Sequence, residues 1–241
     1  MELTVLGKYG PFPKDGGATS SYLLKVADKN ILLDCGAGAF SRLLEIVKPE
    51  DIDVIILSHF HMDHTSDIGV LIYYYQILFA NGYNKKPFVF CPQGGGPLFE
   101  TVVNCPYFDV SVVMGGEISM VGDVDFDFFP MRHPVECVGV KISCNGKTFA
   151  YTGDTNVCDS LDDLYDGSDL VLADGCFLMQ DWAELKPHLS VEHIVELTKK
   201  YGNKSIISHI NPKYTQEELQ EAIKEVEDKC LIAQEGKTYE F

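Results

Sequence analysis

The densest group of reactive side chains in this sequence is the hexapeptide His59–His64, which holds three imidazoles and one carboxylate. It directly follows the apolar run Asp53–Ser58, whose length and composition are typical of a buried strand. Ligands of open α/β sheets gather just beyond the carboxyl ends of strands. Imidazole is the commonest metal ligand in proteins, and carboxylates bind hard or borderline cations. We therefore expect a metal site here rather than a histidine-rich surface loop.

Four later segments with strand-like patterns lead into the same types of side chain. They are residues 124–129 before His133, 148–152 before Asp154, 169–173 before Asp174 and 205–208 before His209. Taken singly, such an aspartate is usually a turn former, and such a histidine is a surface or satisfied core residue. Because the pattern recurs at strand ends, we expect these residues to share one rim of one sheet system with the hexapeptide.

These motifs resemble those of the metallo-β-lactamase superfamily, whose first signature is His-x-His-x-Asp-His. Shorter matches resemble its ribonuclease Z-like branch, and they lie at residues 6–24, 33–36, 152–155 and 208–214. The resemblance implies an α+β fold, the metallo-β-lactamase αββα four-layer sandwich. In that fold two β-sheets lie face to face, and helices cover both outer surfaces.

The resemblance also implies a binuclear metal centre. One ion would be held by His59, His61 and His133, the other by Asp63, His64 and His209, with Asp154 bridging the two. We expect two divalent ions per chain, Zn²⁺ first, although ligands of this type also suit Mn²⁺ and Fe. A hydroxide bridging the ions would attack the substrate. Asp63 would in addition accept a proton or steer that hydroxide.

A proton donor for the leaving group is implied by the same resemblance. His188 resembles the histidine of the ribonuclease Z-like branch that works beside the metals without binding them, and Asp174 takes the place of the carboxylate that orients it. An imidazole held by a carboxylate can stay protonated near neutral pH and serve as a general acid. The alternative is a solvated loop histidine and a turn-forming aspartate.

Two features bear on the substrate. Ribonuclease Z grips tRNA with an arm inserted between the third histidine and the bridging aspartate, but the stretch from His133 to Asp154 has room for one hairpin only. The formal net charge is −17, with 36 acidic against 19 basic residues, whereas RNA affinity draws heavily on Lys and Arg contacts to phosphates. We expect a small phosphodiester, such as a cyclic nucleotide or a short nucleotide fragment, rather than nucleic acid.

Other functions remain open at this point. They are a tRNA 3′-processing endoribonuclease, a thioester or lactone hydrolase, and an iron-dependent redox protein of the same superfamily. Arg132 and Lys213 flank ligand positions, and each would contact a substrate phosphate or simply lie in solvent. The run Tyr73-Tyr74-Tyr75 must expose at least one ring if it is helical, which is compatible with a homodimer interface, a pocket wall or no special role.

Composition sets the frame for these expectations. A chain of 241 residues, 46% hydrophobic and without a recognisable linker, suits a single domain over residues 1–241. The eight cysteines form no CxxC pair and indicate reduced thiols. With neither a signal peptide nor a membrane span recognisable, we expect a cytoplasmic protein that does not enter membranes. Helices are expected at residues 66–82, 190–201 and 215–229.

Overall fold

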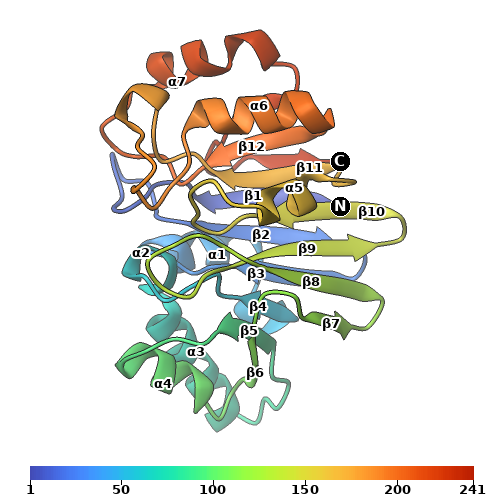
Figure 1. Ribbon diagram of the computed structural model, residues 1–241. Coiled ribbons are helices and arrows are strands. Elements are labelled where there is room, and N and C mark those ends of the chain that lie inside the picture. The colour runs from blue at the N-terminus through green and yellow to red at the C-terminus, as the bar shows by residue number, and fades with distance from the viewer.

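The computed structural model describes residues 1–241, which form two seven-stranded sheets with helices outside both (Figure 1). The first sheet has the order β14 (Thr238–Glu240), β1 (Glu2–Gly7), β2 (Ser21–Val26), β3 (Lys29–Leu33), β4 (Val54–Ile56), β5 (Phe88–Pro92) and β6 (Asp109–Val113). The second has the order β13 (Cys230–Ile232), β12 (Lys204–Ser208), β11 (Leu170–Asp174), β10 (Lys147–Tyr151), β9 (Val138–Cys144), β8 (Val124–Pro130) and β7 (Ile118–Val121).

The helices divide between the two outer surfaces. Those from the first half of the chain are α1 (Ala39–Ile46), α2 (Met62–Thr65), α3 (Ile68–Ala80) and α4 (Pro97–Val103), and those from the second half are α5 (Ser160–Tyr165), α6 (Val191–Tyr201) and α7 (Gln216–Ile223). In Figure 1, α3 and α4 lie at the bottom and α6 and α7 at the top. Short 3₁₀ turns occur at Pro49–Asp51, Met179–Asp181 and Lys224–Val226. None of the helices has the length and apolar character that a membrane crossing requires.

The apolar side chains of the strands alternate between two cores, because successive side chains of a strand point to opposite faces of its sheet. In β3, Ile31 and Leu33 join the core between the sheets, whereas Leu32 joins the core beneath the helices of the first half. In β4, Ile55 lies in that outer core, while its neighbours on either side face the other sheet. Strands buried on both faces explain the continuous apolar runs in the sequence, and the layers confirm the expected αββα sandwich.

Helix boundaries follow the capping residues. Ser190 caps α6 and Gly202 ends it in the left-handed conformation, so the helix expected at residues 190–201 is confirmed. Thr215 forms a capping box at the start of α7, as its Thr-x-x-Glu sequence predicts. The expectation that this helix continues to residue 229 is wrong. It ends at Ile223 and tightens into a 3₁₀ turn, which stacks residues three apart and so keeps both Ile223 and Val226 against the core.

Strand direction gathers the carboxyl ends of several strands at one rim. Strands β3 and β4 are parallel, and so are β10, β11 and β12. Strand β8 pairs antiparallel with β9, which pairs antiparallel with β10, so β8 runs in the direction of β10. The loops leaving β3 and β4 therefore open at one edge of the first sheet, and those leaving β8, β10, β11 and β12 open at one edge of the second. The contact of His209 with Asp63 shows that the two edges meet.

Candidate metal centre

The loop after β4 carries the contiguous ligands. His59 and His61 lie on an extended segment, and the single turn of α2 then presents Asp63 and His64. The Thr65 hydroxyl donates to the carbonyl of His61 over 2.8 Å and closes this turn. Because the chain changes from extended to helical here, His59 and His61 enter one cluster of side chains, and Asp63 and His64 enter another.

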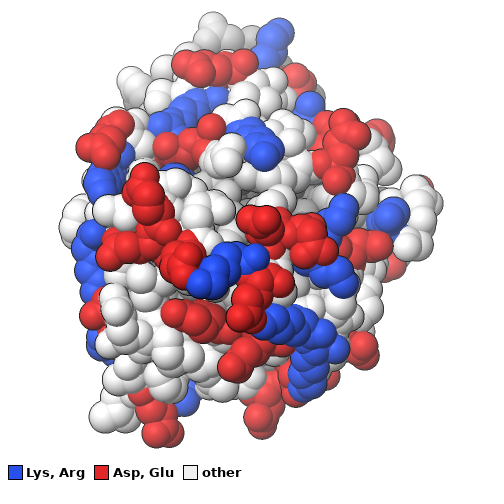
Figure 2. Space-filling model, turned by 90° about the horizontal axis from the view of Figure 1, so that it is seen from above, with Lys and Arg blue, Asp and Glu red and all other residues white.

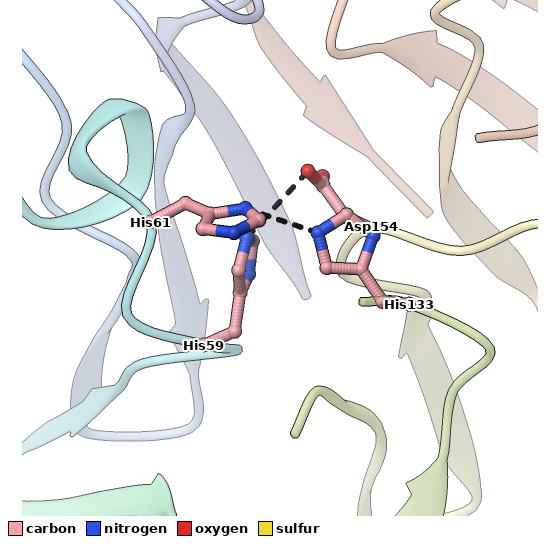
Figure 3. A group of neighbouring side chains, drawn as sticks. All are labelled: His59, His61, His133 and Asp154. Atoms are coloured by element: carbon pink, nitrogen blue, oxygen red, sulfur yellow. Dashed lines mark hydrogen bonds and ion pairs between the residues drawn. The ribbon is translucent and has the colours of Figure 1, made fainter. Parts of the chain in front are cut away.

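One cluster joins three imidazoles and a carboxylate. Figure 3 shows His59 and His61, from the loop after β4, facing His133 and Asp154, which come from the second sheet. His61 Nδ1 lies 3.0 Å from His133 Nε2, and His59 Nε2 lies 3.6 Å from Asp154 Oδ2. All four candidate ligand atoms are within 4.8 Å of one another. This spacing is compatible with one cation among them.

A second cluster shares Asp154. His64 Nε2 lies 3.2 Å from Asp154 Oδ1, and His209 Nε2 lies 3.3 Å from Asp154 Oδ2. Asp63 Oδ2 completes the group at 3.1 Å from His209 Nε2. The structure thus brings the seven ligand positions implied by the resemblance into two groups of four, with Asp154 common to both.

The donor set fits metal cations. His59 Nε2, His64 Nε2 and Asp154 Oδ1 are buried and make no hydrogen bond in the protein; the two imidazole nitrogens only approach the Asp154 carboxylate, at 3.6 and 3.2 Å. Buried polar atoms left unpaired cost about 1–3 kcal/mol each, so native proteins rarely keep them without a use. Imidazole nitrogens and carboxylate oxygens converging in this way suit Zn²⁺, Mn²⁺ or Fe. The chain therefore offers residues for two divalent cations.

The ionisation of the two clusters differs. Burial lowers the pKa of His59, His61 and His133, which favours neutral imidazoles with free lone pairs. Burial also lowers the pKa of His64, but the charges of Asp154 and Asp34 outweigh it and raise the pKa to about 10.

In the remaining ligands of the second cluster, the effect of burial on the pKa is likewise opposed by neighbouring charges. For His209, burial is outweighed by the charge of Asp154, which raises the pKa of the imidazole well above its ordinary value. Burial raises the pKa of Asp154 in turn, but the charges of His209 and His64 lower it well below its ordinary value. Positive charge is therefore favourable at this place even without a metal ion, which is what a cation site requires.

Asp34 supports the candidate site, although the sequence reasoning assigned it no role. It is fully buried, has a left-handed φ of 55°, and accepts hydrogen bonds from His64 Nδ1 at 2.7 Å and from the Tyr151 hydroxyl at 2.6 Å. Ser58 donates to the same carboxylate through its backbone N–H and its hydroxyl. Asp34 therefore fixes the ring of His64 so that Nε2 points into the second cluster. Its place directly after β3 was the signal that could have revealed it.

His188 and Asp174 lie together beside both clusters. His188 Nδ1 donates to Asp174 Oδ2 over 2.8 Å, and the backbone N–H groups of Thr155 and Cys176 donate to the same carboxylate. The His188 ring stacks on His209 with ring centres 4.8 Å apart. Burial lowers the pKa of His188, but the charge and hydrogen bond of Asp174 outweigh it and raise the pKa above its ordinary value.

Asn156 and Trp182 hold the loop that carries His188, and the sequence reasoning identified neither. Asn156 is fully buried, and its Oδ1 accepts a 3.0 Å hydrogen bond from the indole N–H of Trp182. Its amide group donates to the carbonyls of Glu184 and Lys186. With a further hydrogen bond of 3.4 Å to the Ala183 carbonyl, Asn156 occupies four polar groups of the segment just before His188, a role that no local pattern in the sequence signals.

Arg132 and Lys213, which flank ligand positions in the sequence, and the remaining histidine, His193, have defined places. The Arg132 guanidinium donates to the carbonyls of Glu184 (3.0 Å) and Val157 (3.4 Å), so its hydrogen bonds go to the backbone. Lys213 Nζ pairs with Asp181 at 2.8 Å. His193 is the third residue of α6, and its Nδ1 lies 3.0 Å from the Ser190 hydroxyl, so it belongs to the helix cap.

Comparisons with known proteins agree with this architecture. Residues 29–210 match the family described as Beta-lactamase superfamily domain. The probable metallo-hydrolase YhfI of Bacillus subtilis is 27% identical over 213 residues, covering 87% of each chain. Ribonuclease Z of Mycolicibacterium gilvum is 26% identical over 234 residues, covering 84% of this chain and 81% of the relative.

Solved structures give the same result at the level of the fold. The crystal structure of the metallo-β-lactamase fold protein YhfI from Bacillus subtilis superposes with a TM-score of 0.92 and 26% identity, over 100% of this chain and 99% of that one. Human tRNase Z, short form, has a TM-score of 0.78 and 16% identity, over 100% of this chain and 99% of that one. A diphosphatase from the PhnP family has a TM-score of 0.75 and 17% identity, over 100% of this chain and 97% of that one. The chain belongs to the β-lactamase superfamily, with a metallo-β-lactamase fold.

Proposed function

We propose that this protein is a binuclear metal-dependent hydrolase that cleaves small phosphodiesters, such as cyclic nucleotides or short nucleotide fragments. One observation carries the proposal. The His188–Asp174 pair lies against the two histidine–carboxylate clusters that share Asp154, so a proton donor and a place for two cations meet in one site. Hydrolysis of an ester with an alkoxide leaving group uses both.

The seven ligand positions would hold two divalent ions, Zn²⁺ first with Mn²⁺ or Fe as alternatives. When bound, such ions supply the Lewis-acid charge that activates water and neutralises phosphate oxygens. The protein supplies the rest. Asp174 holds Nδ1 of His188, so the other ring nitrogen, Nε2, is free to give its proton to the leaving oxygen. Asp63 is suited to accept a proton from the attacking water.

The names of the compared proteins support a phosphate-ester substrate. The relatives include ribonuclease Z, and the structural neighbours include tRNase Z and a diphosphatase. At 16–17% identity the structural neighbours share the fold only. The chemical class therefore rests mainly on the paired His188 and Asp174 of this chain.

RNA cleavage is the second candidate, and the ribonuclease Z relatives favour it, so the comparisons do not support excluding nucleic acid. Two features of the structure favour a smaller substrate. The chain between His133 and Asp154 is filled by the β9–β10 hairpin and forms no protruding arm. Acidic and basic side chains alternate on the face over α6 and α7, as Figure 2 shows, with ion pairs such as Lys199–Glu225.

The first experiment is hydrolysis of a chromogenic phosphodiester by purified protein of measured metal content, with and without a chelator. We expect turnover with about two metal ions per chain and its loss on chelation. A panel of cyclic nucleotides, precursor tRNA, thioesters and lactones then ranks the substrates. Faster cleavage of precursor tRNA than of every small ester would favour the endoribonuclease. Bound iron with a visible absorption band and no hydrolysis would favour a redox protein.

A further inference from the structure

A cavity of about 450 Å³ opens directly beside the first ligand cluster. His61 forms part of its wall, and the other walls include Phe60, Gln93, Val135 and Glu136. Ligand sites for small molecules have volumes of about 300–1,000 Å³. The cavity therefore has room for a substituent of a substrate whose reacting group lies at the ligand clusters.

One wall of the cavity is formed by the aromatic side chain of Phe60. The Phe60 ring meets Phe99 edge to face, with ring centres 5.3 Å apart. A Cβ atom at Gly94 would lie 2.7 Å from Phe60 and 3.0 Å from Phe99, so only glycine allows the backbone to approach these rings so closely. Gly94 and Phe99 therefore pack closely against Phe60, and an aromatic ring is suited to contact a flat apolar group.

The charge in the cavity is negative. Glu136 is the only acidic side chain among its lining residues, and no lysine or arginine lines it. Phosphate groups would be repelled here. A group that donates hydrogen bonds would instead be attracted, because a carboxylate has two acceptor oxygens and can take two parallel N–H donors.

Cations lie on the side of His188 instead. Lys186 Nζ is 4.5 Å and Lys213 Nζ 6.0 Å from the centre of the Phe177 ring, whose centre is in turn 5.8 Å from that of His188. In the proposed hydrolysis, water adds to phosphorus, the P–O bond on the His188 side breaks, and the leaving oxygen takes the His188 proton. The cavity beside His61 is then left for the group that stays on phosphorus.

We propose that this cavity binds a nucleobase of the retained half of the substrate, and that Glu136 selects a base with adjacent N–H donors. Guanine has this pattern, because its N1–H and its 2-amino group lie side by side. Hypoxanthine has the same ring system without the 2-amino group. The inference rests on the proposed function for the identity of the retained half, whereas the affinity of the cavity for the base is independent of hydrolysis.

Equilibrium binding of guanosine and inosine to the metal-loaded protein tests this directly, because neither nucleoside contains a phosphate. Paired hydrogen bonds to a base edge discriminate between bases by about tenfold or more. We expect guanosine to bind about tenfold more tightly than inosine. Glu136→Gln replaces one acceptor oxygen with an amide and should reduce this ratio to about threefold or less. Glu240→Gln, at an exposed position in β14, is the matched control and should keep the ratio.

Equal affinity for the two nucleosides, no measurable binding of guanosine, or an unchanged ratio in Glu136→Gln would each overturn the proposal. Hydrolysis of the 4-nitrophenyl esters of guanosine and inosine 5′-monophosphates, in which 4-nitrophenolate leaves and the nucleoside stays on phosphorus, separates this failure from that of the proposed function. Selective guanosine binding without phosphodiester cleavage would leave the base subsite standing and refute the phosphodiesterase. Cleavage without any difference in kcat/KM between the two esters would do the reverse.

Discussion

The two halves of the candidate metal centre share Asp154 but are supported differently. In the first half, the outer ring nitrogens meet neutral groups: His59 Nδ1 lies 3.0 Å from the Ser58 hydroxyl, and His133 Nδ1 donates to the Pro187 carbonyl at 3.2 Å. In the second half they face carboxylates: His64 Nδ1 bonds to Asp34 at 2.7 Å, and His209 Nδ1 lies 3.5 Å from Asp174 without a hydrogen bond.

Exposure differs in the same sense. In the first half His59 is buried but His61 and His133 are half-buried, whereas both histidines of the second half, His64 and His209, are buried. A carboxylate behind an imidazole fixes its orientation and raises its basicity as a ligand. We therefore expect the second half to hold its ion more tightly, and the first half, nearer to solvent and to the cavity at Glu136, to exchange its ion more readily. Four substitutions break or sharpen this difference.

Asp154→Ala should have the largest effect, because it removes the one ligand that both halves share. We expect bound metal to fall from about two ions per chain toward none, and hydrolysis to fall on the order of a thousandfold. Metal analysis after dialysis checks the first effect, and initial rates check the second. Asp125→Ala, at an exposed position of β8, serves as the control. Retention of both ions by Asp154→Ala would remove this residue from the centre.

His188→Ala should spare both halves and still slow the reaction. The proposed proton donor is lost, so kcat should fall about a hundredfold for a substrate with an alkoxide leaving group. A substrate with a 4-nitrophenolate leaving group needs less protonation and should be affected much less. His193→Ala is the histidine control, because His193 lies outside the ligand set; its ring caps α6 and meets Trp182 edge to face, with ring centres 4.6 Å apart. A loss of metal in His188→Ala would show that His188 is a ligand.

Asp34→Asn should separate the two halves. The neutral amide no longer supports His64, so the affinity of the second half for metal should fall about tenfold to a hundredfold, while the first half keeps its own. Competition with a chromogenic chelator resolves the two binding steps, and circular dichroism checks that the fold persists. An equal loss of metal affinity in both binding steps would contradict the inference that carboxylates support only the second half.

Asn156→Ala should have the smallest effect on activity, because it changes only the loop that carries His188. It removes the acceptor for Trp182 and the donors to the carbonyls of Glu184 and Lys186, so His188 should be less well positioned and kcat should fall up to about tenfold. Trp182 is the only tryptophan of the chain, so a red shift of its emission reports exposure of this loop. Metal content should stay at the wild-type level. An unshifted emission with normal kcat would show that Asn156 does not hold the loop.

Much of the frame was readable from local sequence. The His-x-His-x-Asp-His loop, the apolar strands that precede the candidate ligands, and the cap of α6 all depend on residues close together in the chain. Covalent spacing and the periods of strand and helix decide such features, so they carry over directly from sequence to structure. The end of α7 could not be predicted in this way, because it depends on the packing of Val226 against the core.

The contacts between distant segments were decided by the tertiary structure. Strand order and parallel pairing set which strand ends share a rim, and so bring Asp154 and His209 to the loop after β4. The hydrogen-bond partners of these side chains also depend on the tertiary structure, and the spacing of residues in the sequence does not reveal them. Asp34 binds His64 Nδ1, and Arg132 donates to backbone carbonyls. Local residue types thus determine which chemistry is available, and sheet register with hydrogen-bond pairing determines which side chains meet to perform it.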